Sequence, residues 1–281
     1  AEDNFAYAQD DVNGLSMTLT EFSEIIPESG YKTYQGSFVF STGTSSLQNI
    51  GTTLDSVENA FVMIYTASDD NTPDVWQVTG YISSTTQVTF NRADAGADVQ
   101  VSWFVVEAMN SEFTVQTGTI DLGSGITSNT ATITNVDTAR TIVIGKTRVS
   151  DVAAADGDSQ DGYATVELQD STTVLAERTS AATGVSATVR YQVVQFSGVS
   201  GVTVQTGEVT VSNPATTSVS ISSVDMAQSM VFYSWDASDN GIQQVNIFGQ
   251  ITSSTSLEFG RYSSTSFTNR IRWYVIEVPG A

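Results

Sequence analysis

The stretch Val101-Ser-Trp-Phe-Val-Val-Glu107 recurs near the C-terminus as Ile271-Arg-Trp-Tyr-Val-Ile-Glu277. A more divergent copy, Val189-Arg-Tyr-Gln-Val-Val-Gln195, lies between these two. In each copy, alternate residues are apolar, which is the two-residue period of a β-strand that has one face in a core. The sequence therefore repeats a strand-containing unit three times.

An arginine ahead of each copy sets the length of the unit. Arg92, Arg178 and Arg261 each end a short alternating segment, and they are 86 and then 83 residues apart. Self-similarity at a fixed period is the signature of tandem repeats. Three units of about 85 residues account for positions 29–281.

The segments between these markers predict strands and almost no helix. Alternating runs such as Val202-Thr-Val-Gln-Thr206 are separated by turn residues such as Asp121-Leu-Gly-Ser-Gly125. We therefore predict an all-β chain of three tandem antiparallel β-sandwich repeats with about six strands each. The predicted divisions are a contact arm at 1–28 and repeats at 29–110, 111–198 and 199–281.

The repeated strand is apolar on both of its faces. One face carries Trp103 and its equivalents, which fill the core of the sandwich. The opposite face carries Phe104 in the first copy and Tyr274 and Ile276 in the third. A solvated face does not require such residues, so we predict that it packs against another unit or another chain. Phe104, Tyr274 and Ile276 are the predicted contacts with other subunits on this face. The alternative is ordinary surface aromatics, since monomers commonly expose apolar area.

The strand order of the unit resembles that of known proteins. A glycine-led strand, an apolar strand, a strand that ends in arginine and a final V-x-W-x-V-x-E strand resemble the tandem β-sandwich repeats of bacteriophage appendage and bacterial surface proteins. More loosely, the unit is similar to the H-type lectin fold. That family forms trimers of small sandwiches, so the resemblance implies a covalent pseudo-trimer here. It covers about nine tenths of the chain and depends on Trp103, Trp273 and the three arginines.

Charge and composition exclude several classes of function. The chain has 31 Asp and Glu against 10 Lys and Arg, for a formal net charge of −21, and it has no His and no Cys. Nucleic-acid binding requires clustered cations, so no nucleic-acid partner is predicted. No apolar run is long enough to insert into a membrane. Thiol nucleophiles, Ser-His triads and the usual zinc sites are excluded, and we predict that the protein is not an enzyme.

The repeated arginines have two interpretations. Arg92, Arg178 and Arg261 could form a ring of guanidiniums around a pseudo-threefold axis that binds a carboxylate or a sugar acid. The favoured interpretation is a buried ion pair with the series Glu107, Gln195 and Glu277.

An acidic loop in the middle unit is the one candidate metal site. Asp156, Asp158 and Asp161 supply hard oxygen ligands, so Ca²⁺ is the only cofactor considered. The loop lacks the spacing of an EF-hand, and the alternative is a solvated turn.

The first 28 residues lie outside the repeat and contain apolar residues that a solvated leader does not need. We predict that this arm binds a neighbouring subunit or a particle surface. The alternative is a strand within the first unit. The predicted contacts in the arm are Phe5, Tyr7, Leu15, Leu19 and Phe22.

Two functions remain from different classes. The first is a non-catalytic structural subunit of a virion surface, as a decoration, fibre or tail appendage, or of an extracellular assembly. Its partners would be other protein subunits, in an oligomer at a virion or cell surface. The alternative is a carbohydrate-binding adhesin, for which Trp76 and Trp235 are the candidate glycan contacts.

Overall fold

A computed structural model describes residues 30–68, 73–150, 162–181, 184–198, 201–212, 216–238, 247–261 and 268–278. Within these residues the chain is all β, with six antiparallel three-stranded sheets that pair into three sandwich units, so the predicted fold class is confirmed. The short helical elements are α3 (Pro73–Trp76) and the 3₁₀ turns η1 (Val57–Asn59), η2 (Thr138–Arg140) and η4 (Met226–Gln228).

Each unit uses six consecutive strands. Unit 1 contains β1 (Tyr31–Phe40), β2 (Ser45–Asn49), β3 (Ala60–Ala67), β4 (Thr79–Ser84), β5 (Gln87–Asn91) and β6 (Val99–Ala108). Unit 2 contains β7 (Phe113–Leu122), β8 (Ser128–Thr132), β9 (Thr141–Ser150), β10 (Thr165–Asp170), β11 (Thr173–Glu177) and β12 (Ser186–Phe196). Unit 3 contains β13 (Thr203–Val211), β14 (Thr216–Ser220), β15 (Ser229–Ala237), β16 (Phe248–Ser253), β17 (Ser256–Gly260) and β18 (Asn269–Glu277).

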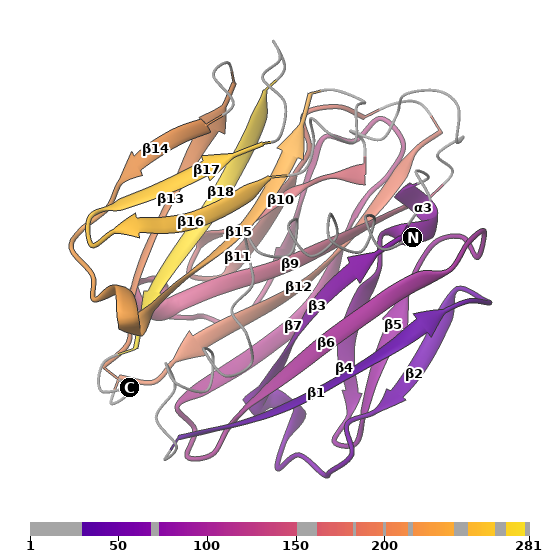
Figure 1. Ribbon diagram of the computed structural model, residues 1–281, viewed down its shortest axis with the longest axis horizontal. Helices are drawn as coiled ribbons and strands as arrows, with labels where there is room; N and C mark the ends of the chain where they lie inside the picture. Colours follow the sequence, from indigo (N-terminus) through magenta and orange to yellow (C-terminus); the bar gives the residue numbers. More distant parts are fainter. Residues whose placement is uncertain are drawn as a thin grey trace, which may run out of the picture.

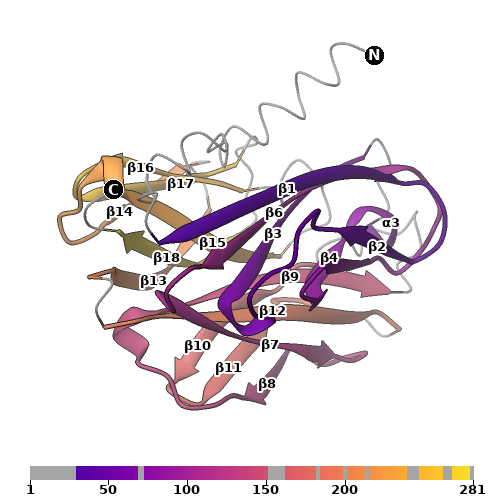
Figure 2. The ribbon, with the colours of Figure 1, turned by 90° about the horizontal axis from the view of Figure 1, so that it is seen from below.

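The same topology is used three times. The long strands form the sheets β1-β6-β3, β7-β12-β9 and β13-β18-β15, and the short strands form β2-β5-β4, β8-β11-β10 and β14-β17-β16. The strand that carries the repeated motif is therefore the centre of each long-strand sheet. In Figure 1, strands of unit 2 run between unit 3 at the upper left and unit 1 at the lower right, and in Figure 2 unit 2 lies below the other two units.

An aromatic side chain on the central strand fills the core of each unit. Trp103 and Trp273 are 3 % and 5 % exposed, and a glycine of the first strand lies directly over each ring. A Cβ atom on Gly36 would lie 2.3 Å from Cζ2 of Trp103. The recurring glycine is thus required by close approach to a ring.

The cores of the three units are not separate. Units 1 and 3 each have an internal cluster, but the core of unit 2 continues into residues from the outer faces of the other two, such as Val106 and Ile276. The predicted cover on the outer faces therefore comes from other units of the same chain. Tyr274 and Ile276, which we expected to contact other subunits, are 3 % and 5 % exposed within this chain, so that assignment is wrong.

Candidate functional site

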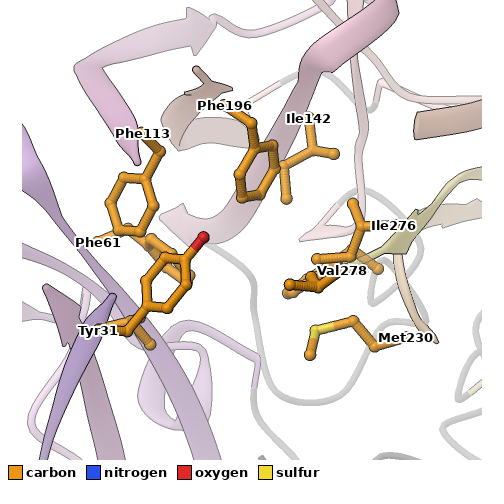
Figure 3. A pocket seen from close by; sticks show the side chains of 10 residues that line it. Tyr31, Phe61, Phe113, Ile142, Phe196, Met230, Ile276 and Val278 are labelled. Atoms are coloured by element: carbon orange, nitrogen blue, oxygen red, sulfur yellow. The ribbon is translucent and has the colours of Figure 1, made fainter. Parts of the chain in front are cut away.

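Side chains from all three units line one small apolar pocket (Figure 3). Phe61, Ile142 and Met230 hold equivalent positions, each being the second residue of β3, β9 or β15. They line a cavity of about 20 Å³, close to the volume that one water needs. The other lining residues are Tyr31, Val106, Phe113, Phe196, Phe232, Ile276 and Val278. Because these side chains are aromatic or aliphatic, the cavity serves packing and offers little to orient a polar ligand.

The three repeated arginines are buried and donate hydrogen bonds within their own units. Arg92, Arg178 and Arg261 are 0 %, 2 % and 3 % exposed, so they cannot form an accessible ring of ligand-binding guanidiniums. Arg92 donates to the backbone carbonyls of Gly43 and Ala97 and lies over the ring of Phe40.

Arg178 and Arg261 play the same part in units 2 and 3. Arg178 donates from Nε to the Ile126 carbonyl at 2.9 Å and from Nη2 to the Gly123 carbonyl at 2.9 Å. Arg261 donates to Oδ1 of Asn269 at 2.8 Å. Arg178 thus fastens a loop of unit 2, and Arg261, which follows β17, is tied to the first residue of β18.

The acidic series expected to pair with these arginines has another role. Glu107 accepts hydrogen bonds from the Tyr34 hydroxyl and the Asp55 amide, and Glu277 accepts from the Asp225 amide. These carboxylates hold the loop that enters the 3₁₀ turn, so the predicted ion pairs are wrong.

Trp76 and Trp235 belong to an aromatic cluster between units. Both pack on Tyr163 of unit 2, with ring centroids 6.2 and 5.8 Å away. Trp235 lies within β15 and not in a loop, and both side chains are half-buried. The pair joins units instead of standing free in loops, as glycan contacts would.

Of the other predicted site residues, only some lie in the part of the chain that the structure describes. Phe104 is half-buried and packs edge-on against Tyr65. The five arm residues and the acidic loop with Asp156, Asp158 and Asp161 lie outside the described residues. Among the residues that the structure does describe, no group of three or more acidic side chains is arranged to hold a metal ion.

Polar side chains join the units by hydrogen bonding to buried backbone groups of edge strands. The Gln192 side chain in β12 accepts from the Val62 amide and donates to the Val62 carbonyl, both at 2.8 Å, so it completes the pairing of edge strand β3. Ser234 makes the same two contacts with Val166 of edge strand β10. The sequence signal for these contacts was a polar residue on an otherwise apolar outer face, and we missed it.

A charged network fastens unit 3 to unit 2. Arg270 pairs with Asp236 at 2.6 Å and with Glu177 at 3.0 Å, while Arg272 pairs with Glu167 at 3.1 Å. Arg272 also pairs with Glu208 of its own unit at 2.8 Å. Burial raises the pKa of the Asp236 carboxyl above its ordinary value, and the Arg270 charge opposes this shift. Sequence reasoning missed this network because its members are far apart in the chain.

Comparison with known proteins gives no family. The fold defines the chain as an all-β protein of three tandem sandwich units with a shared core. No protein-family model matches it, and no curated protein matches it in sequence. Among solved structures, it is similar to a chain from the atomic structure of Sulfolobus Turreted Icosahedral Virus at 12 % identity and a TM-score of 0.18, over 89 % of this chain and 91 % of that one. So low a score supports no conclusion about fold or function. No helix in the described part of the chain has the length and hydropathy to cross a bilayer.

Proposed function

We propose that this protein is a non-catalytic structural subunit of a virion surface or an extracellular assembly. The observation that carries the proposal is the shared core. Units 1, 2 and 3 contribute buried residues to one apolar cluster, which includes Val106, Phe196 and Ile276. Such packing resists relative motion of the units. The subunits of an assembly must contact their neighbours in one geometry. A subunit whose units do not move relative to one another meets that requirement.

Unprotected edge strands supply surfaces for such neighbours. The short-strand sheets end in β2, β8 and β14, which are paired on one side only among the described strands and contain no charged residue. Leu47 of β2 is 59 % exposed. Natural monomers usually guard such edges with lysine, proline or a bulge, because a free edge pairs readily with another strand. The net charge of −21 keeps free subunits apart until edges of matching geometry meet.

Lysine substitutions at the edges test this proposal. Leu47, Thr130 and Ser218 hold equivalent exposed positions on β2, β8 and β14. We expect the wild type to form larger species as its concentration rises in sedimentation velocity, and the triple Lys variant to remain monomeric.

The control adds the same charge away from the edges. Thr53, Asn135 and Ser223 are exposed at equivalent loop positions, one residue before Leu54, Val136 and Val224. The triple Lys variant of these residues should assemble like the wild type. Equal assembly by both variants would overturn edge pairing, and a wild type that stays monomeric but binds a glycan array would favour the carbohydrate-binding alternative.

A further inference from the structure

Three of the ten basic residues lie together on the outer face of unit 2. Arg190 in β12 stands directly opposite Lys146 in β9, and Arg148 lies two residues further along β9 on the same face. Lys146 is exposed, and both arginines are half-buried. Like charges directly opposite each other destabilise a sheet, so the cluster requires an explanation in a chain with a net charge of −21.

Arg190 is held in place by unit 1. Its guanidinium carbon lies 3.8 Å from the centroid of the Tyr81 ring in β4, a cation–π contact that leaves the edge of the guanidinium to bind. Burial lowers the pKa of Arg190, and the nearby charge of Arg148 lowers it further. Within the part of the chain that the structure describes, none of the three cations forms an ion pair with a carboxylate.

In the equivalent junction between units 2 and 3, carboxylates surround the arginine that corresponds to Arg190. The register of the strands makes Arg272 the equivalent of Arg190, and Arg272 is paired with Glu167 and Glu208. At the junction of units 1 and 2, uncharged or basic residues replace the acids. The replacements are Tyr81 for Glu167, Thr119 for Glu208, Asn91 for Glu177 and Arg148 for Asp236.

We propose that Lys146, Arg148 and Arg190 bind a small oxyanion, a carboxylate, phosphate or sulfate group, at the junction of units 1 and 2. A guanidinium offers two parallel N–H donors to such a group, and the lysine adds a mobile point charge. The bound anion takes the place of the carboxylates that the other junction builds in. It removes the repulsion between the opposed cations and ties Tyr81 of unit 1 to the outer face of unit 2.

Isothermal titration calorimetry tests the site with sodium sulfate, sodium phosphate and sodium citrate, each against sodium chloride at the same ionic strength. We expect saturable binding of at least one oxyanion, and the ranking of the three identifies the group. Arg190→Gln should raise Kd by roughly tenfold or more, the scale of one lost charge-assisted hydrogen bond.

Two further variants control the experiment. Lys32→Gln removes the same charge from an exposed position on β1, and it should bind as the wild type does. Tyr81→Glu places a carboxylate at the position that Glu167 holds in the junction of units 2 and 3. This carboxylate should pair with the cations in place of the added anion and abolish anion binding. The circular-dichroism spectrum should not change. Heats no larger than those of chloride for all three anions would overturn the proposal, and so would equal binding by the wild type and Arg190→Gln.

Discussion

At the scale of single residues, large and small side chains are exchanged between units at fixed positions. Ile64 packs over Gly80 in unit 1, and in unit 2 the order is reversed, with Gly145 beside Val166. In unit 3, Gly249 again faces large rings. At each of these sites a glycine makes room for a larger side chain of the same unit, which keeps the core filled, as close packing demands.

The glycine over each core ring gives the first prediction. A Cβ atom on Gly207 would lie 2.6 Å from Cζ2 of Trp273, inside a rigid core. We expect Gly207→Ala to cost roughly 1–3 kcal/mol in the free energy of unfolding, by overpacking. Urea denaturation measures this loss. Gly123→Ala is the control, since its Cβ would meet nothing closer than 3.9 Å, and an equal loss in both variants would refute the packing argument.

The buried arginines give the second prediction. Arg178→Met leaves the carbonyls of Ile126 and Gly123 without their charged donor, so we expect a loss of about 3 kcal/mol. Arg140→Met removes only a partly exposed pair with Asp137 and should cost less than about 1 kcal/mol. Chemical denaturation of the two variants decides the matter. A small loss of unfolding free energy for Arg178→Met would mean that these hydrogen bonds contribute little to stability.

The sequence predicted which residues fill the cores better than it predicted which groups the buried arginines contact. The period identified Trp103 and Trp273 as core residues, because alternation follows directly from strand geometry. The arginines stood out as unusual, but Arg92 and Arg178 donate to backbone carbonyls of loops and Arg261 donates to the Asn269 side chain. Nothing in the spacing of Arg178 and Gly123 indicates that contact.

At the scale of elements, the joints depend on edge strands that meet sheet faces. The central strands carry Phe104, Gln192 and Tyr274 at one equivalent position, and each makes a different contact. Gln192 caps β3, while the Tyr274 hydroxyl accepts from the Leu168 amide of β10. The strands themselves were predictable from the local alternation of polar and apolar residues. These joints were not, because divergence among the three copies conceals them.

The buried carboxylate on β15 gives a pH prediction. Because burial raises the folded-state pKa of Asp236, the folded state binds more protons than the unfolded state just above the ordinary Asp value of 3.8. The free energy of unfolding therefore falls as pH rises through that window. Asp236→Asn should make this dependence flatter in urea unfolding between about pH 4 and 7.

An exposed acid is the control for this prediction. Glu58→Gln removes the same charge from an exposed position in η1 and should keep the wild-type dependence on pH. Indistinguishable slopes for the wild type and Asp236→Asn would show that this carboxyl titrates normally.

At the scale of the whole molecule, three units of one topology contribute to a shared core within one chain. Equivalent residues of the three units line one cavity, while each junction has its own chemistry: an ionic network between units 2 and 3, and a cation–π contact of Arg190 with Tyr81 between units 1 and 2. Fusion into one chain allows the junctions to diverge, which identical subunits related by symmetry cannot do. The resulting block is asymmetric in detail and fixed in overall shape.

Differential scanning calorimetry of the full chain tests whether the three units form one body through a shared core. A shared core couples the unfolding of its members, so we predict a single transition with a ratio of calorimetric to van't Hoff enthalpy near 1. Met230→Asp, at the cavity that all three units line, should lower the midpoint of that one transition without splitting it. Separate transitions in the wild type, or a ratio near 3, would contradict the account, because the units would then be independent domains.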